Sequence, residues 1–146
     1  MLIAGVHLVR AQTAPSIAPV ASSPQQSGSE FWVEIRVGTT DRPVSNLFGA
    51  SFVLDYDPSR VSVVDEERGA FLGSDLVFSA TVNETAGEVG IGVSRKSGAG
   101  GVNGNGGIAR VRFAVDAVLD PGSQVSFGLK EVSANDDAGV FLDLLP

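Results

Sequence analysis

The sequence predicts an all-β sandwich of about nine strands. Apolar and polar residues alternate along successive segments of roughly eight residues, the pattern of strands with one buried face. The 18 glycines and 7 prolines among 146 residues divide the chain into short segments. No segment shows a convincing helical period. Short strands separated by frequent turn signals are typical of a β-sandwich.

The expected strands follow one another from residue 15 onward. The segment FWVEIRVG alternates strictly, with Phe31, Val33 and Ile35 on one side. In LFGASFVLDYDP the alternation ends at Asp57-Pro58, because proline has no N–H to donate to a ladder and favours a turn. The complete set of expected strands is residues 15–22, 31–38, 47–58, 60–67, 76–83, 88–95, 107–117, 123–132 and 139–145.

Residues 1–14 differ from the rest of the chain. The segment LIAGVHLV is apolar, and Val9-Arg10-Ala11 has the small-x-small pattern of a signal-peptidase site. We expect residues 1–14 to be a signal-peptide remnant or an N-terminal extension, and residues 15–146 to form one secreted or cell-surface domain. The apolar run is too short to span a bilayer.

Composition excludes several classes of protein. A net charge of −7 gives almost no electrostatic support for nucleic-acid binding. The absence of cysteine excludes disulfides and thiolate chemistry. A catalytic triad needs a histidine base, and His7, in the N-terminal segment, is the one histidine. We therefore expect no enzyme activity and no cofactor.

The glycine-rich stretch SGAGGVNGNGG, residues 97–107, raises the question of a phosphate site. A phosphate-binding loop needs a lysine after its glycines and a helix after that, whereas here Lys96 precedes them and a strand pattern follows. We expect a flexible connection between two strands, whose glycines permit positive φ angles.

The alternation places two different sets of side chains on the outside of the sandwich. One set is mostly charged and predicts a solvated face with cross-strand ion pairs: Trp32, Glu34, Arg36, Arg110, Arg112 and Asp116. The other set is small. If its four strands share a sheet, they form a nearly flat outer surface, called here the small-residue face: Gly49, Ser51, Val53, Val77, Ser79, Thr81, Gly90, Gly92, Ser94, Ser126, Gly128 and Lys130.

Several glycines on one strand face indicate the close approach of another backbone. A partner protein is one candidate for that backbone, with Asp55, Arg95 and Lys130 orienting it from the rim. The alternative is that the chain's own loops or N-terminal segment cover the face.

Four segments resemble the cohesin family in order and spacing. They are FWVEIRVG, LFGASFVLDYDP, RGAFLGSD and GVNGNGGIARVRFAVDA, and the likeness runs from Pro15 to Leu145. The most specific parts are the turn Tyr56-Asp57-Pro58 and the glycine loop leading into GIARVRFAV. The resemblance implies a nine-stranded sandwich of jelly-roll topology, found in secreted and cell-surface proteins, that is non-catalytic and binds dockerin modules.

The resemblance also implies a binding surface. Cohesins bind through the outer face of the sheet formed by their third, fifth, sixth and eighth strands, which by order are the strands of the small-residue face. The chain departs from dockerin-binding members at Gly49, Ser51 and Gly92, where those members carry larger or more polar side chains. A cohesin-like module outside the cellulosome is the alternative that this departure leaves open.

Calcium is the one metal that the sequence suggests. The segment NDDAGVFLD gathers the oxygen donors Asn135, Asp136, Asp137 and Asp143. Its spacing is not that of an EF-hand loop, and Asn-Asp runs commonly form turns.

Three kinds of function remain open. The first is a protein-recognition module that binds a dockerin or similar helical partner. The second is a structural subunit of an extracellular fibre or surface layer, in which the N-terminal segment adds as a strand to a neighbouring copy. The third is a carbohydrate-binding module, for which Trp32 is the one clear exposed aromatic candidate.

Overall fold

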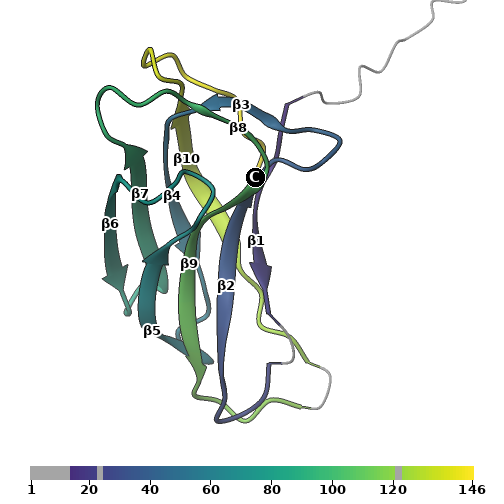
Figure 1. Cartoon of the computed structure of the whole chain (residues 1–146). Helices are drawn as coiled ribbons and strands as arrows, with labels where there is room; N and C mark the ends of the chain where they lie inside the picture. Colours follow the sequence, from purple (N-terminus) through teal and green to yellow (C-terminus); the bar gives the residue numbers. More distant parts are fainter. Residues whose placement is uncertain (1–13, 23–24, 121–122) are drawn as a thin grey trace, which may run out of the picture.

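The computed structural model describes residues 14–22, 25–120 and 123–146, which form ten strands in three antiparallel sheets (Figure 1). The expected all-β architecture is therefore confirmed, with ten strands rather than nine. The proposed signal remnant or extension, residues 1–14, lies outside the described residues except for Ala14.

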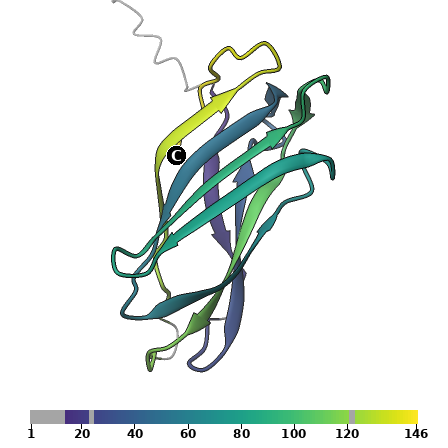
Figure 2. The same cartoon turned by 90° about the vertical axis from the view of Figure 1, so that its left-hand side faces the viewer.

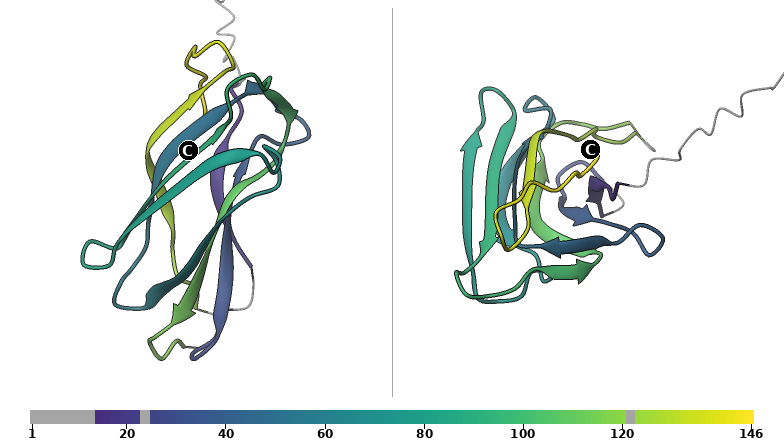
Figure 3. Two further views of the ribbon diagram at one scale, coloured as in Figure 1. Left: turned by 60° about the vertical axis from the view of Figure 1, so that its left-hand side comes forward. Right: turned by 90° about the horizontal axis from the view of Figure 1, so that it is seen from above.

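Two four-stranded sheets build the body of the molecule. The first contains, in order, β1 (Ile17–Ala21), β2 (Glu30–Val37), β9 (Gly106–Val115) and β5 (Val61–Arg68). The second contains β10 (Gly128–Asn135), β4 (Gly49–Asp55), β7 (Glu88–Arg95) and β6 (Leu76–Asn83). At one end, β3 (Val44–Leu47) pairs with β8 (Val102–Gly104). Seen from above, the two large sheets face each other as two layers (Figure 3).

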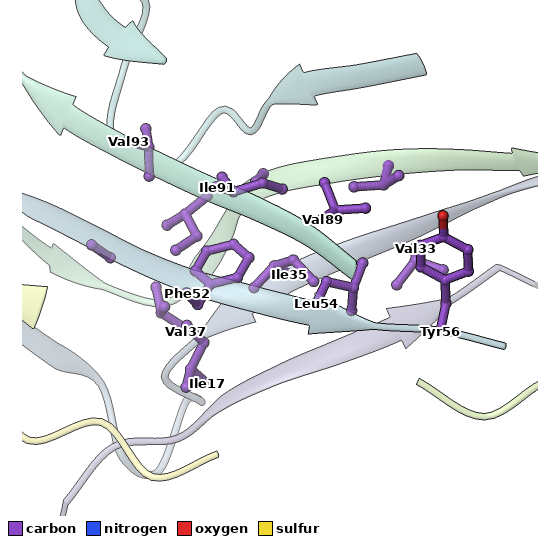
Figure 4. Close-up of a cluster of buried hydrophobic side chains, with 14 of the residues drawn as sticks. Ile17, Val33, Ile35, Val37, Phe52, Leu54, Tyr56, Val89, Ile91 and Val93 are labelled. Atoms are coloured by element: carbon purple, nitrogen blue, oxygen red, sulfur yellow. The ribbon is translucent and has the colours of Figure 1, made fainter. Parts of the chain in front are cut away.

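The core fills the space between these layers. Side chains of β2 such as Val33 and Ile35 point toward Phe52 and Leu54 of β4 on the opposite sheet (Figure 4). All four side chains are at most 2% exposed, and the described residues include no buried polar or charged side chain. The alternation read from the sequence therefore identifies the buried faces of β2 and β4.

Four aromatic rings pack together in one part of this core. Phe113 of β9 is fully buried, and its ring centroid lies 5.9 Å from that of Phe31, 5.1 Å from that of Tyr56 and 5.0 Å from that of Phe127. These separations are typical of favourable aromatic pairs. Because Phe127 immediately precedes β10, the cluster connects the first sheet to the start of the strand at the edge of the second.

The expected strand at residues 139–145 is wrong. That segment forms only two isolated bridges, Asn135 with Phe141 and Ser16 with Leu145. The Ile17 amide donates to the Leu145 carbonyl at 2.8 Å, and the Leu145 amide donates to the Pro15 carbonyl at 3.0 Å. The segment thus changes partners from β10 to the chain just before β1, so no continuous strand forms.

Two further strand boundaries differ from the sequence prediction. The segment expected at residues 123–132 is regular only from Gly128, because β4, its pairing partner, ends at Asp55 opposite that glycine. The segment expected at residues 47–58 is divided, since β3 ends at Leu47 and β4 begins at Gly49. Strand β3 was missed, because its four residues show too little alternation to be recognised.

The glycine-rich stretch is a connection between β7 and β9, as expected, but it also contains β8. Two of its glycines, Gly98 and Gly104, have the expected positive φ, at 91° and 125°, and others are required by close packing. A Cβ at Gly101 would lie 2.0 Å from Asn46 Oδ1 and 2.4 Å from the Asn46 carbonyl carbon, and a Cβ at Gly106 would lie 2.9 Å from the Phe71 ring. The backbone therefore passes directly against neighbouring segments, where a side chain has no room.

Replacement of Gly101 by alanine is expected to lower the free energy of unfolding by about 1–3 kcal/mol, because the new methyl group overlaps the Asn46 backbone. Gly100→Ala is the matched control, since a Cβ there meets nothing within 4 Å. It is expected to change the free energy by less than about 1 kcal/mol. Urea unfolding measures both variants, and equal effects would contradict the packing account.

Tyr56, the single tyrosine of the chain, provides a titration probe of the core. Burial and, secondarily, the Glu84 carboxylate raise the pKa of its hydroxyl above the ordinary value. The unfolded chain therefore loses this proton first, and the free energy of unfolding is expected to fall as pH rises above about 10. Ultraviolet titration of the phenolate checks this. An ionisation at the same pH in the folded and the urea-denatured protein would contradict it.

Candidate partner-binding face

The second sheet brings the four strands of the small-residue face together, as the resemblance to cohesins implies (Figure 2). Paired residues form four rows across the strands β10, β4, β7 and β6. These rows are Asn135–Gly49–Ser94–Val77, Ser133–Ser51–Gly92–Ser79, Lys130–Val53–Gly90–Thr81 and Gly128–Asp55–Glu88–Asn83. The intervening residues of β4 and β7 are buried in the core, and those of β6 pack against it.

The middle of this face is slightly hollowed. A shallow depression of about 290 Å³ lies over the first two rows. Ser51 and Ser79 are exposed at its floor, and Val77 at its edge is 58% exposed. The residues that line it are Gly49, Ala50, Ser51, Val77, Ser79, Gly92, Val93, Ser94, Ser133 and Asn135. Within the described part of the chain, no loop of this protein occupies it.

The glycines of the face are of two kinds. A Cβ at Gly92 or Gly128 would meet nothing within 4 Å, and one at Gly90 would meet only the Thr81 carbonyl oxygen, at 3.9 Å. A Cβ at Gly49, in contrast, would lie 3.1 Å from Asn135 Oδ1 and 3.2 Å from Ser94 Oγ. Gly49 is thus required by its own neighbours, whereas the other three leave open space above the sheet.

A charged cluster marks one end of the face. Lys130 Nζ lies 2.7 Å from Glu88 Oε1 and 3.2 Å from Asp55 Oδ1. The hydrogen bond that Lys130 donates to Glu88, and then the one it donates to Asp55, raise the pKa of Lys130 above its ordinary value. The ammonium group is therefore charged at neutral pH and held between two carboxylates. The predicted rim residues Asp55 and Lys130 are brought together, and Glu88 joins them.

Two other predicted residues lie apart from the rows. Ser126 is exposed but precedes β10, so no strand partner holds it in the sheet. Arg95 follows Ser94 and pairs with Leu76, so in the alternation of β7 it falls on the inward side with Ile91 and Val93. Its guanidinium group donates to the Gly100 carbonyl. Arg95 therefore anchors the loop after β7.

Ser133 and Asn135 belong to the face but were missed by the sequence analysis. Glu131 has a φ of 53°, and the register between β10 and β4 shifts between Lys130 and Ser133. This bulge places an extra residue in β10. The outward residues of β10 are therefore even-numbered up to Lys130 and odd-numbered from Ser133 onward. The sequence does carry a signal of the bulge. In a regular strand apolar residues recur every second position, whereas Leu129 and Val132 are three positions apart and two charged residues lie between them.

The outer face of the first sheet is charged, as predicted. Arg110 pairs with Glu67, Arg112 lies 3.6 Å from Glu30, and Arg36 pairs with Glu34. The Arg110 guanidinium carbon lies 4.2 Å from the centroid of the Trp32 ring, and that of Arg112 lies 5.4 Å away. Trp32 is half-buried among these cations rather than presented as a bare aromatic surface.

The acidic segment after β10 forms a turn. Asp136 Oδ1 accepts the amides of Ala138 and Val140 at 2.9 and 2.8 Å, and Asp137 Oδ1 accepts Asn46 Nδ2 at 2.9 Å. Asp143 lies beyond this turn. Residues 14–22, 25–120 and 123–146 contain no group of three or more acidic or histidine side chains placed to hold a metal ion. Calcium binding by Asn135, Asp136, Asp137 and Asp143 stays a prediction.

The fold and this face define a β-sandwich module whose broad sheet surfaces, rather than a reactive cleft, are available for contact. The family model for the cohesin domain matches residues 18–140. The chain therefore belongs to the cohesin domain family. Cohesin modules are non-catalytic protein-interaction domains, so the chain is not an enzyme.

Solved structures of low sequence identity share the fold. A non-cellulosomal cohesin from the archaeon Archaeoglobus fulgidus is 18% identical, with a TM-score of 0.70 over 90% of this chain and 85% of that one. A type II cohesin domain from the cellulosome of Acetivibrio cellulolyticus is 16% identical, with a TM-score of 0.73 over 91% of each chain.

A type I cohesin–dockerin complex from Clostridium thermocellum gives 13% identity and a TM-score of 0.74 over 90% of this chain and 93% of that one. These similarities confirm the expected jelly-roll sandwich. No curated protein matches the chain. In the described residues no helix is long and apolar enough to cross a membrane.

Gly92→Ala and Gly49→Ala are expected to have opposite effects on stability. At Gly92 the methyl group meets nothing and removes backbone freedom from the unfolded chain, which stabilises the fold by about 0.5–1 kcal/mol. At Gly49 it crowds Asn135 and Ser94, which costs about 1 kcal/mol or more. Thermal and urea unfolding of the two variants measure the difference, and a loss of stability at Gly92 would contradict the account of open space.

Proposed function

We propose that this chain is a recognition module that binds a dockerin or a similar helical module through the small-residue face. The observation that carries the proposal is the four-by-four arrangement of outward positions with open space above Gly90, Gly92 and Gly128. A face without bulky side chains lets the backbone of a partner helix come close to the sheet. The exposed hydroxyl groups of Ser51, Ser79 and Thr81 provide hydrogen-bonding groups at the same surface.

Family membership supports the same partner class. The complex from Clostridium thermocellum pairs a cohesin with a dockerin, and a cohesin of Acetivibrio cellulolyticus scaffoldin B has likewise been solved with a dockerin. Both cohesins share the fold of this chain. Their binding mode comes to this chain as part of the proposal, since their sequences are 13% and 14% identical to it.

The charged cluster makes the two ends of the small-residue face chemically different. Lys130, Asp55 and Glu88 occupy one end, while the opposite end carries Val77 and Asn135 in its outermost row. A partner with a complementary charge at one end of its contact surface binds in one orientation more strongly than in the reverse one, because like charges placed together cost free energy. We assign Asp55, Glu88 and Lys130 this orienting role.

A secreted or cell-surface location is part of the proposal, because cohesins are typically extracellular or cell-surface components. The fibre or surface-layer alternative depends on the N-terminal segment, which lies almost wholly outside the described residues, and it stays a prediction. The carbohydrate-binding alternative depended on Trp32. Two arginines lie within cation–π distance of that ring, so Trp32 is not presented as a bare stacking surface, and carbohydrate binding stays a prediction.

The binding test uses isothermal titration calorimetry of the full chain against purified calcium-loaded dockerin modules of type I and type II. The native protein is expected to bind at least one of them. Ser51→Arg and Gly92→Arg are expected to weaken that binding by roughly 30-fold or more, the loss of about 2 kcal/mol, because each places a long cation in the contact surface.

Ser62→Arg is the matched control. Ser62 pairs with Ala114 on the first sheet, away from the small-residue face. This variant is expected to bind like the native protein. Unchanged binding by both face variants would remove the small-residue face from the proposal, and no binding by the native protein to any dockerin would contradict the proposed partner.

A further inference from the structure

One large aromatic side chain stands exposed beside the small-residue face. Phe141 is 81% exposed, whereas Phe31, Phe52 and Phe113 are at most 4% exposed. It lies in the segment that turns back after β10, at the end of the molecule where β3 and β8 lie (Figure 1). Its neighbour Val140 is 59% exposed. Exposed apolar side chains next to a flat face are a feature of contact surfaces.

The register places Phe141 in continuity with the face. Phe141 bridges Asn135 in an antiparallel pair. The Asp136 amide donates to the Val140 carbonyl and the Leu142 amide to the Ala134 carbonyl, both at 2.9 Å, which is the pattern of a non-hydrogen-bonded pair. In such a pair the two side chains lie on the same side of the ladder and close together.

The position of the Asn135 side chain therefore fixes that of Phe141. Asn135 Oδ1 lies 3.1 Å from the point where a Cβ of Gly49 would stand, so the Asn135 side chain is on the outer side of the sheet. Leu142, the next residue, packs against the core, as the alternation requires. Phe141 consequently extends the first row of the face by one position, to Phe141–Asn135–Gly49–Ser94–Val77.

The turn that carries Phe141 is held by several hydrogen bonds. Asp136 Oδ1 accepts two amides within the turn, and the Gly139 amide donates to the Asp136 carbonyl at 3.1 Å. Asp137 Oδ1 accepts Asn46 Nδ2, which ties the turn to β3. The aromatic ring is thus presented from a fixed backbone, so little backbone ordering is needed when it makes a contact.

We propose that Phe141 is an anchor residue for the helical partner, the apolar end of the contact surface opposite Val77. This inference rests on the proposed function and adds to it a specific contact outside the four strands. Four interstrand spacings of about 4.8 Å separate Phe141 from Val77, roughly 19 Å in all. Two helices packed with axes 8–10 Å apart span a similar width.

The chemistry of the partner follows from this arrangement. Between the two apolar ends, the row carries only Asn135, Gly49 and Ser94, and the hollow over these residues is shallow. A helix pair seated there places the outer side of one helix against Phe141. The partner is therefore a helix pair with an apolar side chain, such as leucine, isoleucine or methionine, at that outer position.

The test compares the native chain with Phe141→Ala and Phe141→Leu by calorimetry, with the dockerin that the native chain binds. Phe141→Ala is expected to weaken binding by roughly 10- to 30-fold, the usual effect of truncating an aromatic anchor. Phe141→Leu keeps an apolar side chain and is expected to remain within about 3-fold of the native affinity. Thermal unfolding of both variants is expected to match the native protein, since Phe141 packs little against its own chain.

Val118→Ala is the matched control for removing an exposed apolar side chain. Val118 is 93% exposed and follows β9, at the other end of the molecule from the turn after β10 (Figure 1). It is expected to leave binding unchanged. If the native chain binds a dockerin and Phe141→Ala binds equally well, the anchor role is wrong and the proposed function stands.

Two other outcomes also overturn the anchor role. A loss of binding in Phe141→Ala that Phe141→Leu does not restore would show that the apolar contact is not the cause. If the native chain binds none of the dockerins, the proposed function fails together with the anchor. Only a loss in the alanine variant, restored by leucine and absent from Val118→Ala, supports the assignment.

Discussion

The packing of two four-stranded sheets around one apolar core is the constraint on which the rest of the structure depends. Because successive side chains on a strand point to opposite faces, burial of Phe52 and Leu54 forces Ser51 and Val53 outward. The same rule acts on β7, where Val89, Ile91 and Val93 are buried and glycines lie between them. The small-residue face is therefore a direct consequence of where the core lies, and a one-residue slip of any strand would destroy it.

Much of this could be predicted from the sequence, because strict alternation over seven or eight residues gives a clear signal. The four strands of the face and most of their outward positions follow from it, as does the charged character of the opposite face. That the four strands share one sheet is implied by the resemblance to cohesins, not by the alternation. The segments that failed are those where alternation is short or interrupted. Strand β3 has four residues and β8 has three. In β10, the bulge at Glu131 moves the outward positions by one residue.

The remaining errors have a different origin, since they depend on contacts between distant parts of the chain. Residues 139–145 carry an apolar pattern typical of a strand, yet they are shared between β10 and the chain before β1. The glycine-rich stretch signals a turn by its composition, but Gly101 is glycine because Asn46, far away in sequence, passes against it. Local sequence carries no record of either partner.

The two outer faces of the sandwich differ in what it would cost to cover them. On the first sheet, covering would remove from water the paired charges of Arg110 with Glu67 and of Arg112 with Glu30, and desolvation of charges is expensive even when they are paired. The small-residue face carries serine, threonine, glycine and valine across three of its rows apart from Lys130 and Asn135, and its charges gather at one end. Interface cores are likewise depleted in charged residues, which remain at the rim. The free-energy cost of desolvation therefore favours the second sheet as the surface for a partner. This argument does not depend on the similarity of the chain to other cohesins.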